Sequence, residues 1–312
     1  MTDVQRPDTA GPTGTPPRHE PVFLLSPARS YSTVTLALLA GHPDIYGFPE
    51  MLLFASSTVG QLLDWKPKPW QPPEFVEPQR NGILRAVADL REASQEDAAI
   101  LRAEKWLEER SAWSTRQLMD HLLAQVYPQI GLEKSPETIG TDETLDACVN
   151  SYPQARYIHL TRNPVGSIRS MLDQMHHWSD SSEKAMVVRA ASSWYLGHMR
   201  IVSKLAELPS SQWTRIRAED LLREPESRLP PLLNWLGLRA NSDVISRMRH
   251  TENWRFAHCG PSKNLGGGDP KFLRSPALRP IPEPGEIAFD ESWGLLEQMR
   301  DRMTILAKYL GY

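Results

Sequence analysis

Five short apolar segments, most of them followed by a helical pattern, constrain the fold more than any other feature of this sequence. They are PVFLLS (21–26), DIYGF (44–48), GLEKS (131–135), RYIHLTR (156–162) and WTRIRA (213–218). Buried strands that alternate with helices are typical of a parallel sheet, because each return crossover between parallel strands usually contains a helix. The sequence therefore predicts an α/β fold with a central parallel sheet flanked by helices.

Helical periodicity accounts for much of the chain between these segments. Three stretches between Asn81 and Tyr127 carry apolar residues at three-and-four spacing, which predicts a helical insertion at about 80–128. Further helices are predicted at about 182–207, near 228–238 and within the final SWGLLEQMRDRMTILAKYL.

Three other segments favour neither helix nor strand. Five prolines between Asp64 and Pro78 exclude regular structure there, and residues 259–286 are too rich in Gly and Pro for a helix or strand. Residues 1–20, rich in Pro, Thr and Gly, are predicted to be a disordered tail. The remaining residues, 21–312, are predicted to form a single domain.

Composition excludes several classes of function. The 35 basic and 38 acidic residues are mixed along the chain and give a formal net charge of −3, which argues against a nucleic-acid or membrane-surface partner. Cys148 and Cys259 fit no disulfide framework or metal-ligand spacing. No apolar run is long enough to span a bilayer, and the N-terminus lacks the apolar core of a signal peptide. We therefore expect a soluble, cytoplasmic protein without a metal.

The stretch SPARSYSTVT (26–35) lies between the first predicted strand and an apolar helix. The first turn of that helix would present backbone N–H groups without intrahelical partners, at Ser30, Tyr31, Ser32 and Thr33. These donors, the helix dipole and the charge of Arg29 favour a phosphate-like anion. Ser and Thr are also good helix N-caps, so the loop alone leaves an ordinary capped turn open. The chain contains no GxxxxGK[ST] string, which speaks against an ATP-binding P-loop.

A second element of the same kind is RYIHLTRNPVGSIRSML, which starts at residue 156. Arg162 ends the predicted strand, and Ser170 follows eight residues later in the next helix. An arginine and a serine in these positions can converge on one dianion. A capped turn with a surface arginine would also explain this element in isolation. Two such elements about 130 residues apart favour a ligand with two anionic groups.

The motif Arg29-Ser30-Tyr31-Ser32-Thr33 resembles the R-S-G-[ST]-T loop of sulfotransferases, with Tyr31 in place of glycine. In that family the loop holds the 5′-phosphosulfate of 3′-phosphoadenosine 5′-phosphosulfate (PAPS), and an element similar to Arg162–Ser170 holds the 3′-phosphate. RAEDL at 217–221 is similar to the family's R-Y-E-D-L segment, with Ala218 in place of tyrosine. The resemblance implies a fold related to the P-loop nucleotide-binding proteins.

The glycine-rich stretch SKNLGGGDPKF (262–272) resembles the loop that closes over the nucleotide in this family. Its sequence is most similar to the corresponding loop in sulfotransferases of bacterial polyketide assembly lines. The resemblance implies that Lys263 and the backbone near Gly266 bind the nucleotide, although an ordinary surface turn would also use three glycines.

Sulfonyl transfer needs a base for the acceptor hydroxyl and a cation for the leaving oxygen, on opposite sides of the sulfonate. Glu50 follows the second predicted strand, 21 residues after Arg29, and resembles the general base of tyrosylprotein sulfotransferases. A helix cap or a salt bridge would be its ordinary role. The resemblance implies that Lys134 stabilises the negative charge that develops on the leaving oxygen, and that Arg29 contributes to this stabilisation. His258 is a second candidate, either as a base or as a residue that binds the acceptor.

The resemblance implies transfer of a sulfonate from PAPS to a hydroxyl, with adenosine 3′,5′-bisphosphate as product and no metal. The expected acceptor is a secondary metabolite or a β-hydroxyacyl chain presented by an acyl carrier protein, and the helical insertion lies where that acceptor would approach. A small-molecule kinase of related fold and a non-catalytic nucleotide-binding protein are the alternatives. The side chain of Tyr31 is expected to point toward the acceptor or, alternatively, to pack sideways.

Overall fold

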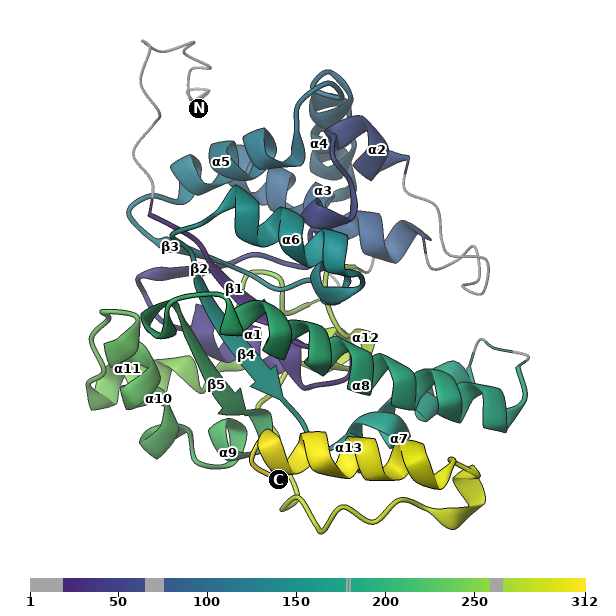
Figure 1. Ribbon diagram of the computed structural model, residues 1–312. Helices are drawn as coiled ribbons and strands as arrows, with labels where there is room; N and C mark the ends of the chain where they lie inside the picture. The colour runs from purple at the N-terminus through teal and green to yellow at the C-terminus, as the bar shows by residue number, and fades with distance from the viewer. Residues whose placement is uncertain (1–18, 65–75, 178, 180, 259–265) are drawn as a thin grey trace, which may run out of the picture.

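Five strands form one parallel sheet in the computed structural model, which describes residues 19–64, 76–177, 179, 181–258 and 266–312 (Figure 1). The strands are β1 (Val22–Leu25), β2 (Ile45–Gly47), β3 (Ile130–Glu133), β4 (Arg156–Thr161) and β5 (Trp213–Arg217). Their order in the sheet is β2-β3-β1-β4-β5, and every neighbouring pair is parallel. Each strand falls on a segment predicted from the sequence, to within one residue. The predicted fold class is confirmed.

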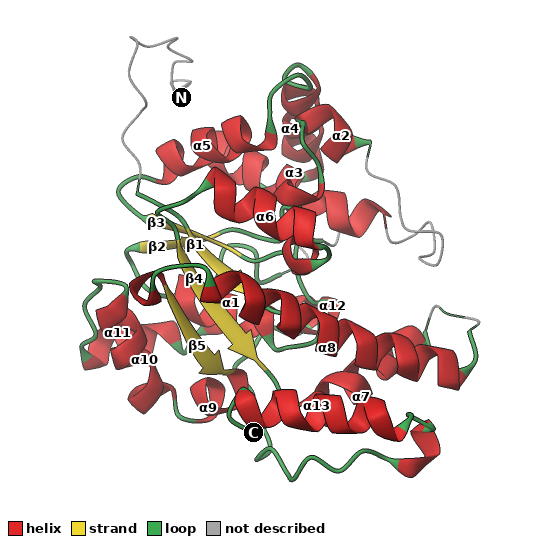
Figure 2. Ribbon diagram, viewed as in Figure 1, coloured by secondary structure: helices red, strands yellow, loops and turns green. Residues whose placement is uncertain are grey.

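Helices cover both faces of this sheet (Figure 2). The longer helices are α1 (Ser32–Ala40), α3 (Val76–Glu92), α4 (Asp97–Glu108), α5 (Thr115–Val126), α6 (Asp142–Ser151), α7 (Pro164–Met175), α8 (Glu183–Ala206), α10 (Pro225–Trp235) and α13 (Glu297–Tyr309). The shorter helices are α2 (Val59–Leu63), α9 (Ala218–Arg223), α11 (Ser242–Met248) and α12 (Pro270–Arg274). None of the described helices is long and apolar enough to cross a membrane.

The central strand explains why the sheet is buried on both faces. All four residues of β1 are buried, as expected of a parallel strand with helices above and below it. The main apolar core surrounds this strand and extends into α3, α4 and α5, which fill the interval between β2 and β3 where the insertion is predicted. A second apolar cluster joins α7, α8 and α13.

Two boundaries differ from the sequence-based expectation. Helix α12 lies inside 259–286, a segment predicted to contain no helix, because Asp269 caps it by accepting from the N–H of Lys271 at 2.9 Å and Pro270 occupies its first turn. Helix α3 begins at Val76, two residues before the predicted loop ends. Most of that loop, and most of the predicted tail, lie outside the described residues.

Gly82 in α3 allows the insertion to touch the segment that carries Glu50. A Cβ at this position would lie 1.8 Å from the carbonyl oxygen of Glu50 and 3.0 Å from the Cα of Gly267. Three distant segments therefore meet at backbone distance, and any side chain at residue 82 would push them apart.

We expect Gly82→Ala to lower the free energy of unfolding by about 2 kcal/mol, because overpacking outweighs the better helix propensity of alanine. Denaturant unfolding measures this change. Gly285→Ala is the control, since a Cβ there meets nothing within 4 Å. A Gly82→Ala variant as stable as the parent would contradict this close approach.

Candidate functional site

Four charged residues singled out in the sequence follow the C-terminal ends of four adjacent strands. In sheet order, Glu50 follows β2, Lys134 follows β3, Arg29 follows β1 and Arg162 follows β4. Open α/β sheets bind ligands at this edge, where the strand order reverses. The strand order therefore places residues from four separate motifs in one row, which we call the charged row, with a carboxylate at one end and arginines at the other.

Residues 29–33 form a turn with an unusual backbone. Arg29 and Tyr31 have φ angles of 65° and 60°, in the left-handed region that residues other than glycine rarely adopt. Ser30 is fully buried, and its hydroxyl has no hydrogen-bond partner among the described residues. Helix α1 begins at Ser32 with no acidic residue in its first turn. Such a turn at a helix N-terminus suits an anion.

The two predicted anion elements form a single hydrogen-bonded cluster. Arg29 Nε donates to Ser170 Oγ at 3.0 Å, and Arg162 Nη1 donates to the carbonyl oxygen of Arg29 at 2.7 Å. Arg29 also pairs with Asp269 at 2.9 Å. Burial lowers the pKa of Arg162, and none of the ion pairs among the described residues includes it. Arg162 is half-buried, and the charge of Glu219 offsets only part of the cost of its burial, so this cluster favours an anionic ligand.

Tyr31 packs sideways onto this cluster. The Arg162 guanidinium lies 3.8 Å from the centroid of the Tyr31 ring, and Arg162 Nη2 donates to the Tyr31 hydroxyl at 3.0 Å. The expectation that this side chain points toward the acceptor is wrong. The attraction between a buried guanidinium and an aromatic face explains the observed direction.

Lys134 connects the anion loop to Glu50. Its ammonium group forms an ion pair with Glu50 Oε1 and donates to Thr33 Oγ1 at 3.2 Å, while only 1% of the side chain is exposed. We expected the base and the cation on opposite sides of a sulfonate. They are instead in contact, because a buried ammonium needs a carboxylate partner.

Two further carboxyl groups flank Lys134. Glu133 accepts from the Ser135 hydroxyl and from the N–H of Met51, and burial raises the pKa of Glu133 to about 7. Burial, followed by the charge of Glu50, raises the pKa of Glu137 to about 7. Sequence reasoning missed Glu137, since a glutamate after a strand-end proline carries no signal of its own. Ser135 Oγ also accepts from the N–H of Met51, at 3.1 Å, and so anchors the segment that follows Glu50.

The glycine-rich stretch reaches the site through residues 266–269. The N–H of Glu50 donates to the carbonyl of Gly267 at 2.9 Å, and the N–H of Asp269 donates to Thr33 Oγ1 at 2.9 Å. The φ of Gly267 is 82°, a conformation that requires glycine. The carbonyl of Gly266, a predicted nucleotide ligand, accepts from Arg85 Nη1 at 2.8 Å. This stretch is thus fastened to both the anion loop and Glu50.

Arg85 and Asp269 were not singled out in the sequence. Arg85 is 1% exposed and also donates to the carbonyl of His258 at 2.6 Å. It therefore binds the carbonyl groups of both His258 and Gly266. An arginine at helical spacing gives no sign of such a role. Lys263 lies outside the described residues.

His258 has no direct polar contact with the charged row among the described residues. Its side chain is exposed, and no hydrogen bond or ion pair between described residues joins its imidazole to Glu50 or Lys134. The described part of the chain also contains no group of three or more His, Cys, Asp or Glu side chains that could hold a metal ion.

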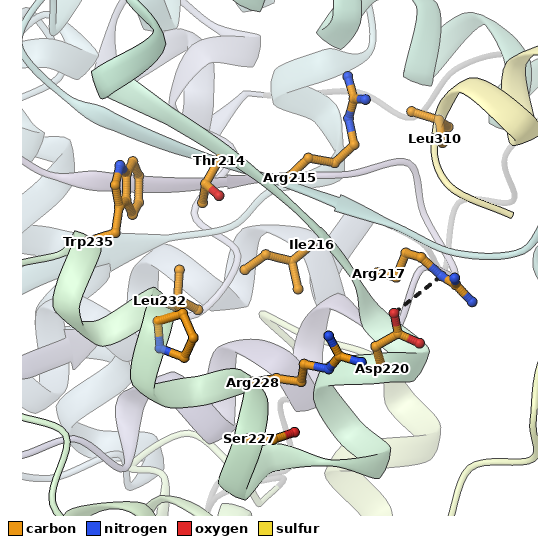
Figure 3. A pocket seen from close by; sticks show the side chains of 11 residues that line it. Thr214, Arg215, Ile216, Arg217, Asp220, Ser227, Arg228, Leu232, Trp235 and Leu310 are labelled. Carbon is orange, nitrogen blue, oxygen red and sulfur yellow. Dashed lines mark ion pairs between the residues drawn. The ribbon is translucent and has the colours of Figure 1, made fainter.

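A separate groove of about 400 Å³ runs along the outer edge of β5 and contains none of the predicted site residues (Figure 3). Arg217 pairs there with Asp220 at 3.5 Å, and Arg228, Leu232 and Trp235 line it from α10. The charged row and this groove are therefore different surfaces.

We expect Glu133→Gln to remove a pH-dependent loss of stability. The pKa of Glu133 is raised from 4.5 to about 7, so the folded state binds the proton more tightly than the unfolded chain. The contribution of Glu133 to stability is therefore greatest below pH 4.5, falls as the pH rises to about 7 and stays lower above it. Between pH 5 and pH 8 the variant should gain on the order of 2 kcal/mol relative to the parent.

Denaturant unfolding at both pH values measures this gain, with exposed Glu286→Gln as the control. A difference between variant and parent that does not change with pH would show that Glu133 is not protonated in the folded state at neutral pH.

Comparison with known proteins agrees with this geometry. The sequence profile of the sulfotransferase family matches residues 21–242. Among solved structures, the sulfotransferase domain from the curacin biosynthetic pathway is 18% identical and has a TM-score of 0.72, over 94% of this chain and 99% of that one. The sulfotransferase domain of the Synechococcus PCC 7002 olefin synthase is 22% identical and has a TM-score of 0.70, over 99% of each chain.

No curated protein matches the chain significantly. The two solved structures share the fold at low identity, and the profile match covers well over half of the chain. The protein therefore belongs to the sulfotransferase family.

Proposed function

We propose that this sulfotransferase moves a sulfonate from PAPS to a hydroxyl of a small-molecule acceptor, with Glu50 as the general base. The observation that carries the proposal is the row of Glu50, Lys134, Arg29 and Arg162 along the C-terminal edge of the sheet. Its arginine end suits a nucleotide with two anionic groups, and its carboxylate end suits a hydroxyl that must lose a proton.

At the nucleotide end, Arg162 and Ser170 would hold the 3′-phosphate, and residues 29–33 would hold the 5′-phosphosulfate. Two features of the free site fit such a ligand. Arg162 lacks a carboxylate partner among the described residues, and the buried hydroxyl of Ser30 lacks a hydrogen-bond partner there. Both groups would gain an anionic oxygen when the nucleotide binds. Gly266 and Lys263 remain proposed contacts to the same ligand.

In the transfer step, the acceptor oxygen attacks sulfur as the bond from sulfur to the bridging phosphate oxygen breaks. Glu50 takes the proton of the acceptor hydroxyl, and adenosine 3′,5′-bisphosphate leaves. Lys134 neutralises the negative charge that develops on the bridging oxygen. Its hydrogen bond to Thr33 already brings the ammonium to the anion loop.

The pairing of Lys134 with Glu50 has a consequence for this step. A carboxylate oxygen that is bound to an ammonium is not free to accept the proton of an acceptor hydroxyl. The negative charge of the donor should draw Lys134 toward the loop and release Glu50. Donor binding would thus activate the base and limit proton transfer in the absence of a donor.

The acceptor is proposed to be a secondary metabolite or a carrier-bound β-hydroxyacyl chain. The sulfotransferase domains of the curacin pathway and of an olefin synthase support a biosynthetic acceptor of this kind. Helices α3 to α5 lie next to the carboxylate end of the row and would contribute to its pocket. The kinase alternative loses support, because the chain lacks a Gly-Lys-[ST] motif and matches the sulfotransferase profile.

We expect adenosine 3′,5′-bisphosphate to bind in a calorimetric titration, and Arg162→Met to weaken its binding by about 30-fold, since one charge-assisted contact is lost. Arg228→Met, in the groove along β5, should leave the affinity unchanged. No binding by the parent protein would overturn the proposed donor, and unchanged affinity in Arg162→Met would remove this arginine from the site.

We expect Glu50→Gln to lower the transfer rate by about 100-fold or more, because the general base is lost. The affinity for the bisphosphate should stay within about threefold of the parent value. Bisphosphate release from PAPS, measured with a panel of hydroxylated acyl thioesters, phenols and sterols, supplies the rate.

Glu286→Gln is the control, because it makes the same change at an exposed glutamate outside the charged row. Full transfer activity in Glu50→Gln would move the base to His258. Binding without transfer to any acceptor in the parent protein would favour the non-catalytic alternative.

A further inference from the structure

Tyr31 occupies a backbone conformation that suits glycine better than tyrosine. Its φ and ψ angles are 60° and 20°, and it is the N-cap of α1. A bulky residue in this region is strained. A strained residue at a ligand-binding turn points to a gain from its side chain elsewhere, so the contacts of the phenol ring are informative.

The ring packs partly against the main apolar core, and its contacts with a charged group are to Arg162. The guanidinium is held from three directions: by the Tyr31 ring at 3.8 Å, by the Tyr31 hydroxyl at 3.0 Å and by the carbonyl oxygen of Arg29 at 2.7 Å. A long side chain normally samples many rotamers, and ordering it costs conformational entropy. The tyrosine therefore orders the arginine before any ligand binds.

The hydroxyl of Tyr31 donates to no acceptor among the described residues. Its oxygen accepts from Arg162 Nη2, so its own hydrogen is available to an anion that approaches the arginine. Ser170 lies in the same cluster through its hydrogen bond with Arg29. An anion at Arg162 would thus meet a fixed charge and the phenol hydroxyl together.

We propose that Tyr31 is a positioning residue that orients Arg162 and adds a hydrogen-bond donor beside it, so that the site selects nucleotides with a second phosphate over 5′-monophosphates. This inference rests on the proposed donor site and adds a specificity determinant to it. The opposite role is a phenol that takes the place of a phosphate oxygen and must be displaced, in which case its removal would tighten binding.

The test compares two stable probes, adenosine 3′,5′-bisphosphate and adenosine 5′-monophosphate, by calorimetric titration. Tyr31→Asn removes the ring but keeps the turn, because asparagine tolerates left-handed backbone. It should lower the affinity for the bisphosphate by about 10- to 30-fold and the affinity for the monophosphate by less than about twofold. Tyr31→Phe keeps the ring and should lose only about three- to fivefold for the bisphosphate.

Tyr309→Asn is the matched control, since Tyr309 also lies under an arginine, with Arg215 4.7 Å from its ring centroid, but outside the charged row. It should leave both affinities unchanged. An equal loss for both probes in Tyr31→Asn would show that the tyrosine merely shapes the loop. Tighter bisphosphate binding in Tyr31→Phe, or no change in either variant, would also overturn the inference.

The wild-type titrations separate this inference from the proposed function. A wild-type protein that binds neither probe overturns the donor site and the role of Tyr31 with it. A wild-type protein that prefers the bisphosphate, with variants that keep the same preference, overturns only the role of Tyr31.

Discussion

The site depends on two cations, Lys134 and Arg162, that the fold withdraws from water at one edge of its sheet. Each must be stabilised, and the two are stabilised in different ways. Lys134 contacts the carboxylate of Glu50 and the hydroxyl of Thr33. Arg162 contacts a carbonyl oxygen, a phenol and an aromatic face, all of them uncharged. Lys134 is therefore paired with a carboxylate, whereas Arg162 forms no ion pair among the described residues and feels the charge of Glu219 only at longer range.

The two ends of the row therefore differ in how they can respond to an anion. Charge that remains at the arginine end favours the binding of an anion, whereas the neutral pair can react to an anion by rearranging. Glu133 and Glu137 add two carboxyl groups around Lys134, and burial raises the pKa of each to about 7. The charge next to Lys134 can therefore change near neutral pH.

Close backbone contacts fix the positions of the segments that carry these charged groups. Gly82 and Gly267 let the insertion, the segment of Glu50 and the glycine-rich stretch approach at distances that a side chain would prevent. Arg85 fastens the same stretch through two carbonyl groups, and Asp269 fastens it to Arg29. A change in any of these segments should reach Glu50 through the backbone.

The five strands, and the charged residues that follow four of them, could be predicted from the sequence alone. Buried parallel strands are continuous apolar runs, and a helix N-terminus binds anions through donors that lie close together in the chain. Three other features emerge from the folded chain alone: the strand order that aligns Glu50, Lys134, Arg29 and Arg162, the direction of Tyr31, and the contacts of Arg85, Asp269 and Glu137. These depend on pairing and burial between segments far apart in the chain, which local patterns of polarity do not encode.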